Sequence, residues 1–190
     1  MKVALLTVAL ASTVGVAQAH PLDTLIQRDA TQESRFANDV AQGKIDVHNA
    51  ALLVRQASDL HALEANVIGE VSALDPHSIA QLRQSESNMA GALNWAEKHP
   101  AKFAGAPDDR MHLRVATQRE AAQEGMIARE LKHDRITPYE AGELEAAQGK
   151  IALAQFDALD KGHESMQSAR SIQDMQNMQD YAIRKNPDLS

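Results

Sequence analysis

The sequence predicts an all-α protein whose six helices form two homologous three-helix units. One stretch occurs twice: residues 27–33 read QRDATQE, residues 118–124 read QREAAQE, and similar residues recur at the same spacing as far as Leu53 and Leu144. The chain also has few aromatic side chains, with three Phe, two Tyr and one Trp among 190 residues. A core built mainly from Ala, Leu, Ile, Val and Met suits closely packed helices better than sheets, because sheets favour β-branched and aromatic residues.

Residues 1–19 have the features of an export signal. Lys2 supplies the positive charge, residues 3–16 form a small and apolar run, and residues 17–19 (Ala-Gln-Ala) form the small-residue site that a signal peptidase cleaves. We therefore expect a periplasmic or secreted protein whose mature chain begins at His20. The apolar run is shorter than the roughly 20 strongly apolar residues that a membrane span requires, so no integral membrane span is expected.

The helices of the first unit are bounded by recognisable start and stop signals. A first helix from about residue 23 to residue 42 ends at Gly43, because glycine readily takes the left-handed conformation that closes a helix. A second helix opens at Asp46 and carries apolar residues at three- and four-residue steps. A third begins at Asp75-Pro76, where a side-chain cap precedes a proline at the first helical position.

The second half repeats this plan after a linker that contains Gly and Pro. Its first helix starts at Asp108 or Asp109 and runs to about His133. The next helix begins at a capping box, in which the Thr137 hydroxyl accepts a hydrogen bond from the Glu140 backbone while the Glu140 carboxylate reaches back. The apolar stripe of a sixth helix follows. The predicted organisation is an export signal (1–19), a first three-helix unit (20–100), a linker (101–107) and a second three-helix unit (108–190).

The turn between the first two helices of each unit carries a pattern of its own. It reads KID at residues 44–46 and RITPYEA at residues 135–141, and the units end in K-x-P at residues 98–100 and 185–187. Together with the preceding Arg- and Gln-rich helix, this pattern resembles a group of uncharacterised exported proteobacterial helical-repeat proteins, which carry a Gly-x-Leu-Thr-x-x-Glu-Ala turn in each unit. The Thr-Pro helix start is also similar to the Leu-Thr-Pro-x-Gln turns of the Spy/CpxP-type periplasmic stress chaperones. These resemblances imply an exported helical protein and, through the second, a chaperone-like role.

Charge and motif content exclude several classes of function. Removing Lys2 with the signal leaves 18 Lys and Arg against 26 Asp and Glu, a formal charge of −8. A nucleic-acid partner is not expected, because binding to phosphate backbones draws on clustered Lys and Arg. The chain has no cysteine, and it contains no Gly-x-Ser-x-Gly, His-Glu-x-x-His or phosphate-loop motif. We therefore expect a non-catalytic protein.

Two groups of residues suggest copper binding. At the mature N-terminus, His20 would carry an α-amine and an imidazole on one residue, and copper favours such nitrogen donors. Near the C-terminus, methionines follow a histidine at helical spacing, as in the thioether donors of extracytoplasmic copper proteins. The alternative for Met166 and Met175 is core packing, because both lie on the apolar stripe of their helix, where flexible Met fills gaps. The predicted copper ligands are His20, His163, Met166, Met175 and Met178.

The sequence also gives expectations for Glu86 and for the polar faces of the repeated stretch. Glu86 interrupts the apolar stripe of the third helix; it either reaches solvent at the edge of the stripe, which we favour because Glu is almost never fully buried unless paired, or serves as a buried partner for a ligand or cation. The polar faces of the repeated stretch are expected to be solvated, with ion pairs at three- and four-residue steps. They comprise Gln27, Arg28, Gln32 and Glu33 and their copies Gln118, Arg119, Gln123 and Glu124.

Three functions are consistent with these features. The first is an exported non-catalytic binding or chaperone-like module, with an apolar groove between the units that holds a protein or peptide segment. The second is periplasmic copper handling through the ligands named above, with copper as the cofactor. The third is a structural, envelope-associated protein, which the sequence does not distinguish from the first without a partner.

Overall fold

The computed structural model describes residues 16–69, 75–99, 107–160 and 166–185, and these residues form six helices with no strand. The predicted all-α fold is therefore confirmed. The helices are α1 (Val16–Ala41), α2 (Val47–Gly69), α3 (Pro76–Lys98), α4 (Pro107–Lys132), α5 (Pro138–Asp160) and α6 (Met166–Lys185). The structure places the start of α1 at Val16, before the predicted start at about residue 23.

Left-handed residues and side-chain caps are found at the helix ends where the sequence predicts them. Gly43 takes φ +70° after α1, and Asp134 takes φ +54° after α4, a conformation that Asp tolerates better than most side chains. The Asp46 carboxylate accepts hydrogen bonds from two backbone N–H groups at the start of α2. At the start of α5, the Thr137 hydroxyl accepts from the Glu140 backbone at 3.2 Å while the Glu140 carboxylate accepts from the Thr137 backbone at 2.7 Å. The predicted capping box is confirmed.

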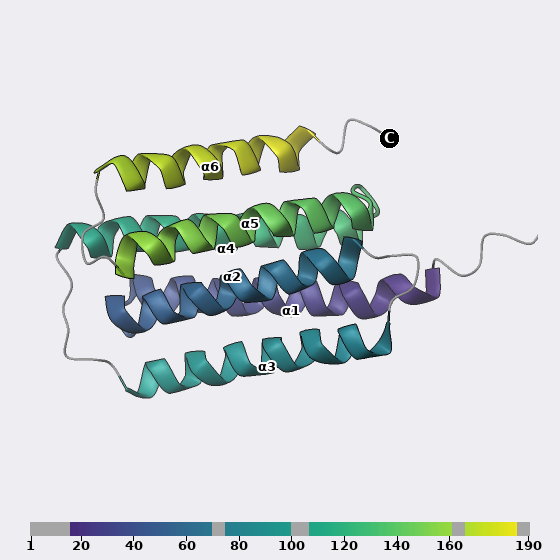
Figure 1. Cartoon of the computed structure of the whole chain (residues 1–190), viewed down its shortest axis with the longest axis horizontal. Helices are drawn as coiled ribbons and strands as arrows, with labels where there is room; N and C mark the ends of the chain where they lie inside the picture. The colour runs from purple at the N-terminus through teal and green to yellow at the C-terminus, as the bar shows by residue number, and fades with distance from the viewer. Residues whose placement is uncertain (1–15, 70–74, 100–106, 161–165, 186–190) are drawn as a thin grey trace, which may run out of the picture.

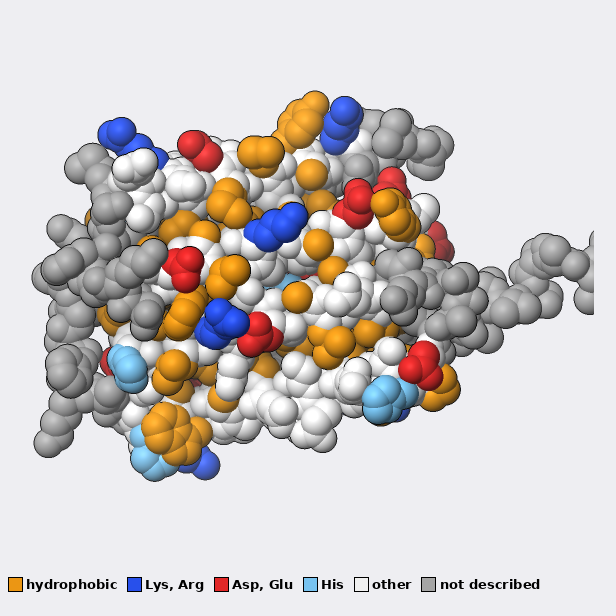
Figure 2. All heavy atoms as spheres, viewed as in Figure 1, with side chains coloured by type: hydrophobic (Ala, Val, Ile, Leu, Met, Phe, Trp, Pro, Cys, Tyr) orange, Lys and Arg blue, Asp and Glu red, His pale blue; other side chains and the backbone are white. Residues whose placement is uncertain are grey.

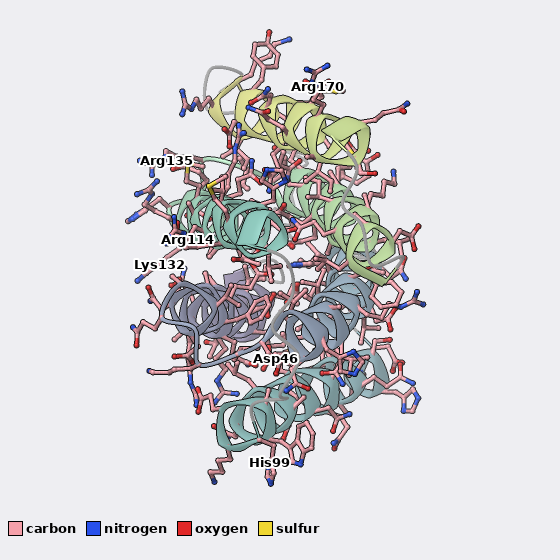
Figure 3. The ribbon with its side chains drawn as sticks, turned by 90° about the vertical axis from the view of Figure 1, so that its left-hand side faces the viewer. Asp46, His99, Arg114, Lys132, Arg135 and Arg170 are labelled. Atoms are coloured by element: carbon pink, nitrogen blue, oxygen red, sulfur yellow. The ribbon has the colours of Figure 1, made fainter. Side chains whose placement is uncertain are left out.

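Four helices form the centre of the molecule and two flank it. The most extensive helix contacts join α2 to α5 and α1 to α4, and in both pairs the helices run in opposite directions (Figure 1). Seen along the bundle, these four helices enclose a common interior, with α3 outside the α1–α2 layer and α6 outside the α4–α5 layer (Figure 3). The two predicted units therefore pack through their first two helices, and their third helices lie on opposite sides.

The apolar core is shared by both predicted units. One buried cluster includes Leu25, Leu60 and Leu93 from the first half together with Ile127 and Leu144 from the second. A smaller cluster under α6 consists of Ala116, Ile151, Ala158 and Ile172. The described helices of the two predicted units thus share one core. The predicted linker at residues 101–107 lies almost entirely outside the described residues.

The buried positions of the flanking helices follow the same pattern. The main buried residues of α3 each lie 90 positions before a buried residue of α6: Leu82, Glu86, Met89 and Leu93 match Ile172, Gln176, Gln179 and Ile183. This correspondence agrees with an internal duplication, which stays a prediction until the two halves are superposed.

The surface carries charges of both signs. On the face seen in Figure 2, acidic and basic side chains are interspersed with small apolar areas. Within the described residues, none of the helices has the length and apolar character needed to cross a membrane.

Candidate metal centre

A histidine lies at the centre of the four-helix core and is surrounded by carboxyl groups. His61, on α2, is 1% exposed. Its Nε2 lies 2.9 Å from Glu33 Oε1 of α1, and its Nδ1 lies 3.0 Å from Glu145 Oε2 of α5. The same Nδ1 is 3.4 Å from Glu64 Oε2 and 3.6 Å from Asp29 Oδ2. One imidazole therefore has four carboxyl groups from three helices around it.

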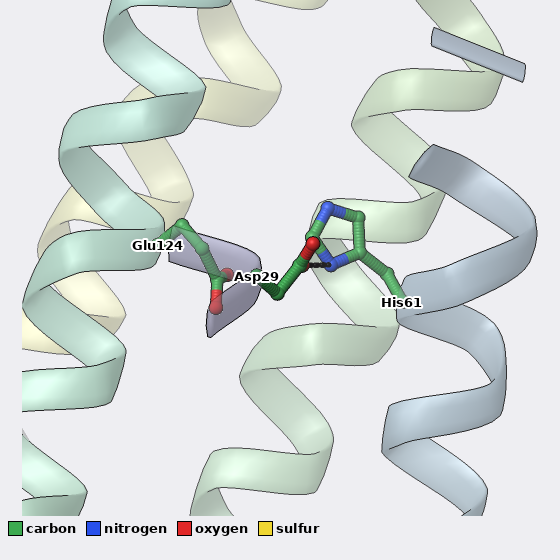
Figure 4. Close-up of side chains that lie close together, drawn as sticks. All are labelled: Asp29, His61 and Glu124. Atoms are coloured by element: carbon green, nitrogen blue, oxygen red, sulfur yellow. Dashed lines mark ion pairs between the residues drawn. The ribbon is translucent and has the colours of Figure 1, made fainter. Parts of the chain in front are cut away.

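The fourth central helix contributes two further acids. Glu124 of α4 is fully buried, and neither of its carboxylate oxygens has a hydrogen-bond partner. Figure 4 shows Glu124 and Asp29 directed toward His61 from different helices, and one atom from each of these three groups lies within 4.8 Å of the others. Glu120, one turn earlier on α4, is also buried. All four central helices thus supply acidic groups to one interior site.

A second set of three groups meets on the α5 side of the same imidazole. His61, Glu64 and Glu145 each place one potential ligand atom within 4.8 Å of the others, and all three side chains are buried. His61 and Glu64 are three residues apart on α2, a spacing that puts them on the same helix face. The site therefore contains two overlapping triads that share His61.

Ordinary helical periodicity explains how the acids enter the core. Asp29 and Glu33 on α1, like Glu120 and Glu124 on α4, are four residues apart and therefore share a face. On α1 that face also carries Ile26, which is fully buried. The acids are therefore buried because apolar residues on the same helix faces pack between α1 and α4.

Burial and mutual repulsion control the protonation of these acids. Burial raises the pKa of Glu64 to about 8, with Glu145 adding to the rise, and burial likewise raises the pKa of Glu120 to about 8. Burial also raises the pKa of Asp29 and Glu124 well above the ordinary range. For His61, burial alone would lower the pKa, but Glu33 and Glu145 outweigh it and raise the pKa well above 6.5.

The charges of the site are poorly compensated by the protein itself. Among the described residues, every ion pair of Asp29, Glu33, Glu64 and Glu145 is made with His61 alone. Several buried carboxylate oxygens also lack hydrogen-bond partners, and an unpartnered buried polar group is costly. They are Asp29 Oδ2, Glu33 Oε2, Glu120 Oε1, Glu145 Oε1 and both oxygens of Glu64 and Glu124.

This donor set is suited to metal coordination. Carboxylate oxygens and imidazole nitrogens are the ligands of Mn, Fe and related first-row ions. Metal sites in four-helix bundles are built in the core from side chains on facing helices, which is where these groups lie. The fully buried and unpartnered Glu124, directed at the imidazole, distinguishes the site from an ordinary cluster of surface acids.

The residues predicted as copper ligands lie elsewhere or outside the described part. Met175 is half-buried on α6 and packs against the small apolar cluster that contains Ile172, as the core alternative expects. Met178, also on α6, is 73% exposed. His163 lies outside the described residues, as do the side chains of His20 and Met166. The copper site stays a prediction.

Two expectations about polar residues are wrong. The repeated polar face is not solvated throughout: Glu33, Gln123 and Glu124 are buried, because this side of α1 and α4 forms the contact between the two helices. Glu86 is 3% exposed rather than reaching solvent, with its carboxylate 4.0 Å from Arg28, and burial raises its pKa to about 7.

Sequence reasoning missed the centre although a signal was present. The acids at positions 29 and 33 recur at positions 120 and 124, and His61 is followed by Glu64 one turn later. Acids repeated at helical spacing between apolar residues are that signal. In comparisons with protein-family models, curated proteins and solved structures, none matches this chain.

Proposed function

We propose that this protein binds metal ions in the core of its four-helix bundle, through His61 and the carboxylates around it. The observation that carries the proposal is the convergence of acids from α1, α2, α4 and α5 on one buried imidazole, with carboxylate oxygens left unpartnered. Isolated buried charges are strongly disfavoured, so buried acids are normally paired or coordinate metals.

Without a cation, the interior approaches neutrality only by binding protons. The imidazole can carry one positive charge, whereas six carboxyl groups lie in the interior: Asp29, Glu33, Glu64, Glu120, Glu124 and Glu145. A core held neutral by protons alone would keep protons on most of these carboxyl oxygens, as the raised pKa values of Glu64 and Glu120 permit at neutral pH. A coordinated cation neutralises the charge and occupies those oxygens together.

The donor chemistry favours a particular class of metal. Oxygen-rich sites suit Mg²⁺, Ca²⁺ and Mn²⁺, and an added imidazole shifts the preference toward Mn²⁺ and Fe²⁺. The absence of cysteine from the chain removes thiolate, the donor that most favours Zn²⁺ and Cu⁺. We therefore propose Mn²⁺ or Fe²⁺ as the resident ion.

Metal titration of the purified protein tests the proposal. After removal of metals with EDTA, Mn²⁺ should bind and raise the melting temperature, since a ligand that binds only the folded state stabilises it. Glu145→Gln should weaken binding at least about tenfold, and it is matched by Glu143→Gln, an exposed acid two residues away on α5 whose loss should change nothing. Failure of every first-row divalent ion to bind or stabilise the protein would contradict the proposal.

A second function, the predicted binding or chaperone-like module, is favoured by one surface feature. A groove between α2 and α3 has a volume of about 230 Å³ and is lined mainly by apolar side chains, including Leu52, Ala92 and the 54% exposed Trp95. Suppression of the aggregation of an unfolded client protein, lost in Trp95→Ala, would support this role. The groove is small for a peptide segment, so the buried centre remains the better supported site.

The other functions predicted from the sequence are also proposals, and each has its own test. Export to the periplasm would be established by finding His20 as the first residue of the mature protein. Copper handling through His20 and the α6 methionines would require copper binding that an added residue before His20 abolishes. A structural, envelope-associated role would require an envelope partner, and the absence of catalysis stays a prediction.

A further inference from the structure

We infer that the buried centre holds two cations rather than one. The inference rests on the proposed function, since it concerns the number and arrangement of ions at the same site. The structure offers two ligand triads that share only His61: one adds Asp29 and Glu124, and the other adds Glu64 and Glu145. The carboxylates of the two triads come from different helices.

A single nitrogen of the imidazole can bind only one metal ion, so Nδ1 belongs to one of the two triads. His61 Nδ1 faces Glu145, Glu64 and Asp29 at 3.0 to 3.6 Å, whereas Nε2 forms its hydrogen bond with Glu33 at 2.9 Å. A metal-bound histidine commonly donates its other ring N–H to a carboxylate, which fixes the ring. Glu33 then orients His61, and Nδ1 binds one ion with Glu64 and Glu145.

The carboxylates on the α1–α4 side are left for a second ion. Glu124 has no hydrogen bond to either oxygen, and Asp29 Oδ2 has none, so both are available as ligands. Their ligand atoms lie within 4.8 Å of the imidazole, close enough for a carboxylate to bridge two ions. Two-metal sites hold their ions about 3.5 to 4 Å apart, a separation that bridging carboxylates span.

The number of donors also suits more than one ion. Six carboxyl groups offer twelve oxygens, whereas a single first-row ion in octahedral geometry takes about six donors. Glu120, one turn from Glu124 on α4, is also buried and has one carboxylate oxygen without a hydrogen-bond partner.

The number of bound Mn²⁺ ions and their magnetic coupling test the inference. Protein loaded with Mn²⁺ and freed of excess metal by gel filtration should contain about two ions per chain and give the multiline EPR spectrum of an exchange-coupled pair, as expected for ions about 3.5 to 4 Å apart. Glu124→Gln should reduce the content to about one ion and leave the six-line spectrum of isolated Mn²⁺. The exposed Glu143→Gln control should keep about two coupled ions.

A second variant and the metal content of the parent protein distinguish failure of the two-ion inference from failure of metal binding itself. Asp29→Asn removes a ligand of the same triad from α1 and should have the same effect, which guards against a folding defect peculiar to one variant; both variants should keep the helical circular dichroism of the parent in EDTA. One uncoupled ion in the parent, unchanged in Glu124→Gln, would overturn the two-ion inference and leave metal binding intact. No retained ion in the parent would overturn both.

Discussion

Both halves of the bundle bury acids, but they differ in the neutral polar groups of their interiors. Among the described residues, the buried polar side chains of α1–α3 include His61 and Glu64 but no glutamine, whereas α4–α6 bury five glutamines: Gln123, Gln148, Gln155, Gln176 and Gln179. Four of these amides donate to backbone carbonyls of neighbouring helices, as Gln176 does to Ala116 at 3.1 Å and Gln179 to Leu144 at 2.9 Å.

This difference distinguishes buried polar groups that hold helices together from buried polar groups that are suited to binding a ligand. A neutral amide that bonds a backbone carbonyl joins two helices at any pH. A buried carboxylate with an unpartnered oxygen does the opposite, because it destabilises the bundle unless a proton or a cation binds. Corresponding positions show the contrast: α3 carries Glu86 where α6 carries Gln176, 90 residues later.

The apolar contacts that hold a flanking helix should dominate stability. Leu93 is fully buried on α3 within the main core. Leu93→Ala should lower the free energy of unfolding by about 2 to 5 kcal/mol, the usual range for a buried leucine in a packed core. Urea denaturation measures this change. A loss below about 1 kcal/mol would mean that α3 is not packed on the bundle as described.

The acid-rich centre should give the metal-free protein an unusual dependence on pH. Glu64 and Glu120 have pKa values of about 8 in the folded protein, above their ordinary value of 4.5. The folded state therefore retains protons that the unfolded chain releases, so the stability these groups contribute is complete below about pH 4.5 and is lost as the pH rises toward 8. The raised pKa of His61 acts in the same direction.

The size of this effect is about 1.4 kcal/mol per pH unit for each retained proton. Urea denaturation in EDTA at pH 5, 6.5 and 8 should show stability falling with pH. Saturating Mn²⁺ should oppose the fall, because the ligands bind metal in their deprotonated forms. Stability in EDTA that is constant or rises over this interval would show that the buried acids are ionised and compensated by the protein itself.

Substitutions at the corresponding positions of the two flanking helices, Gln176 and Glu86, should have different effects on stability. Gln176→Leu leaves the Ala116 carbonyl without its side-chain donor and should cost about 1 to 3 kcal/mol, with metal binding unchanged. Glu86→Gln should change stability by less than about 1 kcal/mol, because its ion pair with the exposed Arg28 is weak and a buried acid is removed. At pH 8 the change should be stabilising. Equal costs for both variants, measured by urea denaturation, would remove the distinction.

A small effect is expected at a methionine of α6. Met175 packs against the small apolar cluster, so Met175→Leu conserves volume and should cost under about 1.5 kcal/mol. Mn²⁺ binding should be unaffected, because α6 contributes no side chain to the centre. A loss of a copper-induced rise in melting temperature in this variant would instead favour the copper site predicted from the sequence.

The elements of the fold were predictable because their signals are local. The capping box of Thr137 and Glu140, the Asp75 cap and the left-handed Gly43 each involve residues within a few positions of one another. The pairing of α1 with α4 and of α2 with α5 depends on residues about 90 positions apart, and the repeated sequence alone did not determine whether the units would pack separately or together.

The centre was missed for a related reason. The repeated Gln-, Arg- and Glu-rich faces were expected to be solvated because charged residues usually are, yet the contact between α1 and α4 buries Glu33 and Glu124. His61 lacks a nearby histidine in the sequence, and its partners come from other helices. Only the assembled bundle brings Glu33 and Glu145, separated by more than 100 positions, to opposite nitrogens of one imidazole.

Anomalous diffraction from crystals grown with Mn²⁺ would locate the bound ions. We expect anomalous density enclosed by α1, α2, α4 and α5, with one ion within about 2.3 Å of His61 Nδ1 and next to Glu64 and Glu145. A matched crystal of Glu145→Gln should show that peak weakened or absent. Contradiction would come from saturated crystals without anomalous density among the four central helices and with His61 still hydrogen-bonded to both Glu33 and Glu145.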